Sequence, residues 1–157
     1  MTKGRKQWLV ACGLLLAAGQ WSRATGDLSK EPYHILIAGV GGAAVTAQRF
    51  LAIGVNQASA TEAVAQTPMP VNGIFKELRC TIGPANASDE SWDFTLDVNA
   101  VASKVTCTVG NSAQTCTDLL NSAPVNVGDL VTINANPTAG AAKSGTPRCS
   151  VILYEYF

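Results

Sequence analysis

The chain has 157 residues, of which 47% are hydrophobic and 14% are charged, and its 11 basic residues balance its 11 acidic residues. This length predicts one domain with a sizeable core, and a neutral chain without a basic surface argues against a nucleic-acid partner. The single histidine, His34, excludes metal sites built from several histidines.

The first residues have the pattern of an export signal. A basic start precedes an apolar run over residues 8–19, and the small residues Ser22 and Ala24 follow it. The run is too short to span a bilayer, which takes roughly 20 residues. We therefore expect residues 1–24 to be a signal peptide and the mature protein to be secreted or at the cell surface, without a membrane span. Its net charge is then 7 − 11 = −4, because cleavage removes four of the 11 basic residues and no acidic one.

Residues 25–47 form a lead-in segment rich in glycine and alanine. The apolar stretch within it, residues 35–47, fits a strand, a short helix or a flexible connection, so the sequence leaves its structure open. His34 stands just before this stretch. A single histidine without a recognisable partner more often has a structural role than a catalytic one.

From residue 48 onward the sequence has the pattern of short β-strands. Trp92, Phe94 and Leu96 alternate with polar residues, which is typical of a strand with one buried face. About eight such segments, separated by turn residues, predict an all-β fold, an antiparallel jelly-roll β-sandwich over residues 48–157. The expected strands include residues 49–55, 73–82, 91–99, 103–109, 114–118, 130–135 and 148–156.

The expected strand over residues 73–82 contains one irregularity. Lys76 interrupts its apolar row, and a charged residue in such a row is typical of a strand near a sheet edge. The inward side chains predicted for this strand are Ile74, Leu78, Cys80 and Ile82.

Removal of the signal peptide leaves four of the five cysteines, and an even number suits an oxidising compartment. Four cysteines allow three pairings, between which the sequence alone does not choose. Cys107 and Cys116 lie symmetrically about the turn-forming residues 110–113, so a hairpin would place them opposite each other. This favours the pairs Cys107–Cys116 and Cys80–Cys149. The spacing lacks the paired cysteines of a four-cysteine zinc site.

The remaining polar residues offer no recognisable catalytic group, cofactor site or metal site. Asp89, Glu90, Asp93 and Asp97 form an acidic cluster, but their spacing is not that of a calcium-binding loop. We expect a solvated acidic surface, with Asp93 and Asp97 on the outward face of their strand, and leave calcium binding open.

Four segments follow one another within residues 48–157: TEAVAQTPMPVNGIFKELRCTI, SWDFTLDVNA, KVTCTVGNSAQTCTD and SAPVNVGDLVTI. This layout resembles small exported or phage-borne jelly-roll domains of the tumour-necrosis-factor and complement globular-head type. The resemblance implies surface display, adhesion or assembly, commonly as trimers, and it carries over no catalytic residues.

We therefore expect a non-catalytic secreted structural or binding module. It should form a homo-oligomer, with a trimer favoured, and it should have a surface glycan or protein as a further partner. The alternative is a secreted glycan-active enzyme on a jelly-roll scaffold. Such an enzyme would need a pocket with two convergent carboxylates of raised pKa.

The last strand supplies the expected interface. If Cys149 faces the core, then Ile152, Tyr154 and Tyr156 lie on the opposite face, which a soluble sandwich normally keeps polar. Tyrosine and isoleucine side chains are typical of an interface core. The competing interpretation is that the lead-in segment of the same chain covers this face.

Overall fold

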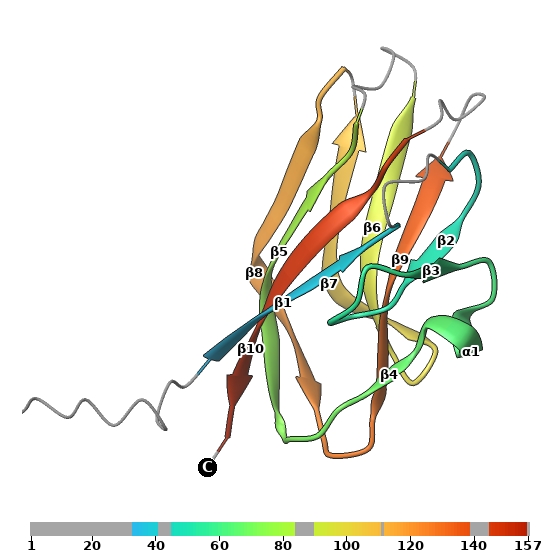
Figure 1. Cartoon of the computed structure of the whole chain (residues 1–157). Helices are drawn as coiled ribbons and strands as arrows, with labels where there is room; N and C mark the ends of the chain where they lie inside the picture. The colour runs from blue at the N-terminus through green and yellow to red at the C-terminus, as the bar shows by residue number, and fades with distance from the viewer. Residues whose placement is uncertain (1–32, 41–44, 84–89, 111, 139–144, 157) are drawn as a thin grey trace, which may run out of the picture. The chain divides into compact units, whose positions relative to one another are not determined.

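The fold is known from a computed structural model, which describes residues 33–40, 45–83, 90–110, 112–138 and 145–156. Two antiparallel sheets lie face to face in Figure 1. No helix among the described residues is long and apolar enough to cross a membrane. The expected signal peptide, residues 1–24, lies outside the described residues. The elements are β1 (Tyr33–Gly39), β2 (Arg49–Leu51), β3 (Ala58–Ser59), α1 (Glu62–Ala65), β4 (Thr67–Pro68), β5 (Gly73–Thr81), β6 (Ser91–Val98), β7 (Val101–Gly110), β8 (Thr115–Val125), β9 (Leu130–Thr138) and β10 (Arg148–Glu155).

The order of the strands confirms the jelly-roll sandwich. Sheet I has the order β1-β10-β5-β8, and sheet II has the order β3-β2-β9-β6-β7, with β4 paired to β9. The chain crosses between the sheets repeatedly, so that the first and last strands are neighbours in sheet I. This double-sheet arrangement is the one that the alternating sequence predicts.

The core lies between the sheets and follows the predicted alternation closely in β6. Trp92, Phe94 and Leu96 have no exposed surface, and they pack in one continuous cluster with side chains of the facing sheet such as Phe75 and Val151. The residues between them in β6 point to the other side of sheet II. Burial of large apolar side chains contributes about 1.5–3 kcal/mol each, which makes this cluster the main source of stability.

The stretch of residues 35–47, whose structure the sequence left open, begins in strand β1, which ends at Gly39. The strand pairs with β10 along its whole length, from Tyr33 opposite Tyr154 to Gly39 opposite Arg148. In Figure 1 it is the blue strand beside the red β10. The sandwich therefore begins before residue 48, and part of the lead-in segment is a strand of sheet I.

Two details predicted for β5 are wrong, and one bulge explains both. Glu77 has a φ of 56°, in the left-handed region, and the register on both neighbouring strands shifts beside it. The extra residue reverses the alternation, so that Phe75 rather than Ile74 is buried. Lys76 consequently points outward from the middle of sheet I, because β5 lies between β10 and β8 and is no edge strand.

The expected disulfide pairs are confirmed, but the expected hairpin is wrong. The bonds join Cys80 to Cys149 and Cys107 to Cys116. Cys80 stands opposite Cys149 on adjacent strands of sheet I. In contrast, β7 belongs to sheet II and β8 to sheet I, so the bond between Cys107 and Cys116 joins the two sheets. The turn after β7 therefore passes the chain from one sheet to the other, where β8 pairs with β5.

Asp118 reinforces this junction between the sheets. Its side chain accepts hydrogen bonds from the backbone N–H of Thr106 in β7, at 3.0 Å, and from those of Leu120 and Asn121 in its own strand, both at 3.1 Å. Burial by itself raises the pKa of Asp118, but the hydrogen bonds from Asn121, Thr106 and Leu120 outweigh burial and lower the pKa below its usual value. A buried charge is tolerated here because backbone donors surround it.

The two disulfides should differ in their contribution to stability. They close loops of 69 and 9 residues, for which the chain-entropy model gives about 4.5 and about 2.5 kcal/mol. We expect the Cys80→Ser/Cys149→Ser double variant to lose more free energy of unfolding than the Cys107→Ser/Cys116→Ser double variant, as measured by urea denaturation. Equal losses would show that the bond between the sheets does more than close a short loop.

Removing the Asp118 carboxylate should destabilise the fold strongly. Asp118→Ala leaves three backbone N–H groups without their acceptor, and we expect a loss of about 2–4 kcal/mol in chemical denaturation. The matched control is Asp93→Ala. Asp93 is only partly buried and accepts one hydrogen bond, from the Thr108 hydroxyl, so this variant should lose less than about 1 kcal/mol. Similar losses in the two variants would contradict the role assigned to Asp118.

Candidate functional site

Several successive outward-pointing positions of β1 and β10 carry apolar side chains. We call the side chains of Tyr33, Ile35, Ile37, Ile152 and Tyr154 the β1–β10 face. Ile35 stands opposite Ile152, and Tyr33 stands opposite Tyr154, with their rings 6.0 Å apart. Ile35 and Ile37 are 63% and 64% exposed. The face therefore presents two aromatic and three aliphatic side chains from adjacent strands.

The predicted interface residues have different positions relative to this face. Ile152 and Tyr154 point outward from β10, and both are partly buried by their neighbours. Tyr156 lies beyond the end of β10, where its backbone N–H donates to the carbonyl of Asn72, and its side chain is 58% exposed. Whether the three form an interface stays a prediction.

The contribution of β1 to this face was not predicted from the sequence. Tyr33, Ile35 and Ile37 have the spacing of one side of a strand, and this was the available signal. The intervening Leu36 is also apolar, which hid the alternation. The β1 strand extends the apolar surface beside β10 and does not cover it, so these described residues do not act as the expected cover.

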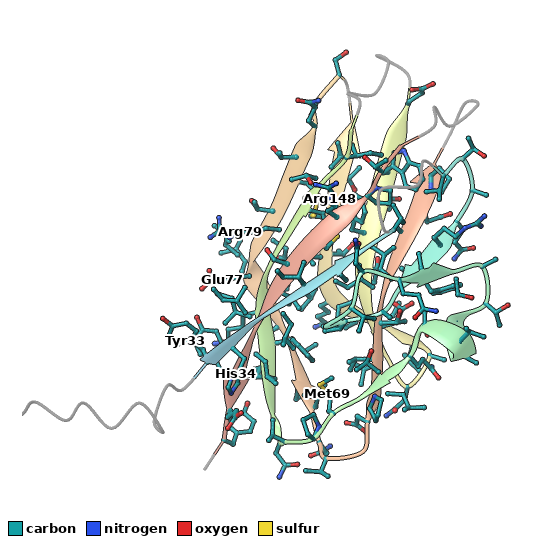
Figure 2. All side chains as sticks on the ribbon, in the orientation of Figure 1. Tyr33, His34, Met69, Glu77, Arg79 and Arg148 are labelled. Carbon is teal, nitrogen blue, oxygen red and sulfur yellow. A yellow bond between two sulfur atoms is a disulfide. The ribbon has the colours of Figure 1, made fainter. Side chains whose placement is uncertain are left out.

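Polar groups border the face on the β5 side. The Tyr154 hydroxyl donates to Glu77 Oε1 at 3.0 Å, and Arg79 Nη2 lies 3.4 Å from the other carboxylate oxygen of Glu77. The hydrogen bond to Glu77 raises the pKa of Tyr154. The Lys76 ammonium lies 5.7 Å from the centre of the Tyr154 ring. Figure 2 shows Tyr33, Glu77 and Arg79 along one side of sheet I. An apolar centre with a charged border is the composition of many protein interfaces.

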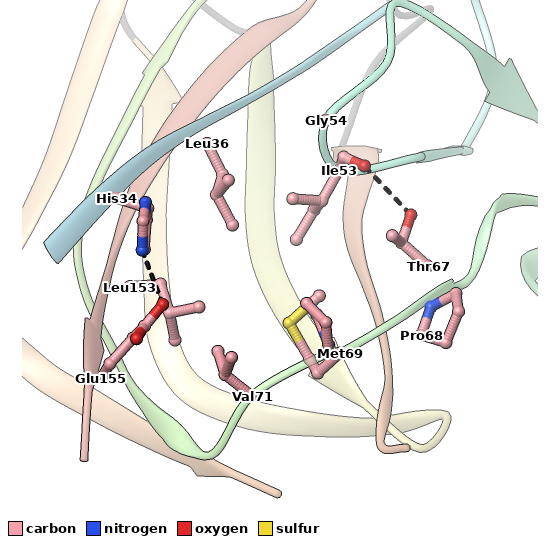
Figure 3. A pocket seen from close by; sticks show the side chains of 11 residues that line it. His34, Leu36, Ile53, Gly54, Thr67, Pro68, Met69, Val71, Leu153 and Glu155 are labelled. Atoms are coloured by element: carbon pink, nitrogen blue, oxygen red, sulfur yellow. Dashed lines mark hydrogen bonds and ion pairs between the residues drawn. The ribbon is translucent and has the colours of Figure 1, made fainter. Parts of the chain in front are cut away.

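A cavity of about 430 Å³ opens at the end of the sandwich near the start of β1 (Figure 3). Apolar side chains, among them Leu36, Met69 and Leu153, form most of its wall. His34 Nε2 and Glu155 Oε1 lie 2.6 Å apart at one side. A cavity of this size and composition suits a small apolar group with one polar end.

Few polar groups line the same cavity. Among the described residues that line it, Glu155 is the only carboxylate and Thr67 supplies the only hydroxyl. That hydroxyl donates to the carbonyl of Ile53 at 3.1 Å, so it is not held by His34 as an activated nucleophile would be.

The prediction that Asp97 is solvated is wrong. Asp97 points outward from sheet II as expected, but only 5% of its surface is exposed. The helix α1 packs beside β2, β3 and β9 (Figure 1), and β9 is the strand that pairs with β6 at Asp97. Burial and the neighbouring charge of Glu62 raise the pKa of Asp97 to about 6, against a smaller opposing effect of the hydrogen bond with Asn134. Asp93, on the same side of β6, stays only partly buried, and Asp89 lies outside the described residues.

Among the described residues, one group of cysteines has sulfur atoms close enough to hold a metal ion. The sulfur atoms of Cys80, Cys107 and Cys116 all lie within 4.8 Å of one another. All three belong to disulfides, so none supplies the thiolate that a metal ion needs. The closeness of the sulfur atoms follows from the packing of the two disulfides against each other.

The raised pKa of Asp97 predicts that its burial opposes folding at neutral pH. Because the folded state binds this proton more tightly than the unfolded chain, the carboxyl destabilises the fold increasingly as the pH rises from about 4 to above 6. Asp97→Asn should therefore be more stable than the native protein at pH about 7.5, by roughly 3 kcal/mol, and nearly equally stable near pH about 4. Denaturation curves at the two pH values test this, and a pH-independent difference would contradict it.

No protein-family model matches the chain, and no curated protein shows significant similarity to it. The geometry of the described residues is therefore the basis for any functional assignment.

Proposed function

We propose that this protein is a secreted, non-catalytic structural module that assembles with further copies of itself through the β1–β10 face. The observation that carries the proposal is the pair of strongly exposed isoleucines, Ile35 and Ile37, which lie beside Ile152 and the pair of Tyr33 and Tyr154. A continuous apolar surface of this kind is typical of an interaction site.

The contrast with sheet II supports this assignment. The outward side of β6 and β7 carries hydroxyl and carboxylate groups, for example Thr95 and Thr106, whose hydroxyls lie 3.1 Å apart, and Asp93, which accepts from Thr108. One antiparallel sheet of a sandwich can face water when its outward row is polar. The outward row of β1 and β10 is apolar instead. Covering it with a second copy removes this surface from water, with a gain of about 25 cal/mol for each Å².

A second copy is the occupant that fits the composition best. Lys76, Glu77 and Arg79 provide both signs of charge at the border of the face, so that two copies can pair opposite charges across an interface. A resemblance to the tumour-necrosis-factor and complement type of jelly roll favours a trimer. Export is supported by the two disulfides, which persist in oxidising compartments, and by the pattern of the first 24 residues.

The alternative of a glycan-active enzyme has less support. The cavity beside His34 is lined by one carboxylate. Asp97 has the raised pKa that a catalytic acid needs, but its side chain is buried and does not line that cavity. We therefore propose a role in assembly, surface display or adhesion rather than in catalysis.

The test is the mass of the protein in solution. For the chain without residues 1–24, light scattering coupled to gel filtration should give an oligomer at micromolar concentration, with a trimer expected. Ile35→Asp should shift the mass to that of the monomer, because it places a charge in the centre of the apolar face. Tyr154→Asp should do the same.

The matched control is Leu120→Asp. Leu120 is 95% exposed in β8, outside the β1–β10 face, so this variant should keep the oligomeric mass. Circular dichroism of each variant shows whether it is folded, and Ile35→Asp is informative even if Tyr154→Asp fails to fold. A monomeric mass of the native chain, or an unchanged oligomer in Ile35→Asp, would overturn the proposal.

A further inference from the structure

The inward-pointing rows of β1 and β10 change from apolar to polar at one end of the sandwich. In β1 the row runs from Ala38 and Leu36 to His34, and in β10 it runs from Leu153 to Glu155. Leu153 is a core residue, whereas the side chains of His34 and Glu155 are 51% and 19% exposed. Two polar side chains therefore stand where the space between the sheets meets the solvent.

These two rows form one wall of the cavity of about 430 Å³ (Figure 3). Figure 3 shows Ile53 and Met69 on the side opposite His34 and Leu153, and both are buried core residues. The backbone N–H of Gly54 donates to the carbonyl of Ile37 in β1 at 2.7 Å, so the two walls are joined at one end. The cavity is thus a space between apolar walls that has its polar groups on one side.

The Glu155 carboxylate is the anionic group of this cavity. His34 Nε2 lies 2.6 Å from Glu155 Oε1, and among the described residues this is the only hydrogen bond or ion pair of the carboxylate. The described residues that line the cavity include no lysine and no arginine. The imidazole of a neutral histidine donates one N–H to such an oxygen and leaves the negative charge in place. The second oxygen of Glu155 can therefore accept from a cationic donor.

We propose that this cavity binds a small alkylammonium compound, with its alkyl chain between the apolar walls and its ammonium group on Glu155. Burial of the chain removes apolar surface from water. A carboxylate beside an apolar cavity binds a charged donor more strongly than a neutral hydroxyl, and it repels another carboxylate. A methylene group takes about the volume of a water molecule, roughly 30 Å³, so a chain of about six to eight carbons fills about half of the cavity.

An ammonium group on an alkyl chain also occurs at the end of a lysine side chain of a partner protein. The lysine side chain has only four methylene groups, and these would fill less than about a third of the cavity. The volume of the cavity therefore favours a free compound with a longer chain over an inserted lysine.

This ligand site is independent of the proposed assembly face, although both use β1 and β10. The β1–β10 face consists of side chains that point away from the sandwich, such as Ile35 and Tyr154. The cavity is lined by the residues that alternate with them, such as Leu36 and Glu155. Loss of ligand binding in a variant of the cavity should therefore leave the oligomeric mass unchanged, and either proposal can fail without the other.

The experiment is calorimetric titration of the purified, disulfide-bonded protein at pH about 8, where aliphatic amines carry a proton. The ligands are hexylamine, 1-hexanol and hexanoate, which share one chain length and differ in the polar end. We expect one hexylamine per protein chain with a Kd of about 1 mM, and at least about tenfold weaker binding of 1-hexanol and hexanoate. Octylamine should bind about 15-fold more tightly than hexylamine, because each added methylene group contributes about fourfold.

Variants make the test specific to this cavity. Glu155→Gln should lose the preference for hexylamine over 1-hexanol, because the amide carries no charge. Val71→Trp places a large side chain in the cavity and should weaken the binding of hexylamine at least about tenfold. Val71→Phe, a smaller change, serves the same purpose if circular dichroism shows that Val71→Trp does not fold. The matched control Asp93→Asn removes one carboxylate charge from sheet II and should bind hexylamine as the native protein does.

Four results would overturn the proposal. They are no binding of hexylamine to the native protein, equal binding of hexanoate or 1-hexanol, an unchanged preference for the amine in Glu155→Gln, and unchanged binding in the folded Val71 variant. Nα-acetyl-lysinamide, which has the ammonium group on the shorter lysine side chain, should bind at least about tenfold more weakly than octylamine. If it binds as tightly, the site is one for a lysine of a partner protein, and the assignment to a free compound is wrong.

Discussion

The bond between Cys80 and Cys149 fixes the register of β10 on β5, and the β1–β10 face depends on that register. The two cysteines stand directly opposite each other, and both side chains point into the core. A strand that slipped by one residue would turn every side chain to the other face. With Cys149 held inward, Ile152 and Tyr154 must point outward, beside Ile35 and Tyr33 of the neighbouring strand. The apolar face is thus a consequence of where the last strand is bonded.

Local departures from regular strand geometry shape the border of this face. The left-handed residue Glu77 reverses the alternation of β5, and the same bulge brings its carboxylate to the Tyr154 hydroxyl. A non-glycine residue in this region costs about 1–3 kcal/mol and persists only where its surroundings hold it. Here the interaction with Tyr154 and the burial of Phe75 offset that cost. The bulge therefore joins core packing to the polar border of the surface.

The outward-pointing side chains of the two sheets differ in polarity. On sheet II, hydroxyl and carboxylate groups bond with one another across β6 and β7. On sheet I, the outward side chains of β1 and β10 that form the β1–β10 face are apolar, whereas Lys76, Glu77 and Arg79 of β5 border them. The exposed isoleucines Ile35 and Ile37 therefore depart from the usual rule of polar outside and apolar inside, and they carry the proposed assembly face.

Alternation and turn residues are local patterns, so the sequence alone predicted the fold class and the buried row of β6. It favoured the cysteine pairs that the structure has, but the hairpin used to argue for them is wrong, because β7 and β8 lie in different sheets. It predicted that Asp97 points outward, and it predicted the direction of Ile152 and Tyr154 once Cys149 was placed in the core. Only the tertiary structure shows that β7 and β8 lie in different sheets, that the bulge at Glu77 turns Ile74 outward, that β1 extends the face beside β10, and that Asp97 is buried. Each of these depends on which distant segment lies against a strand, and a period of two specifies only the face on which a side chain lies, not the neighbour that it meets there.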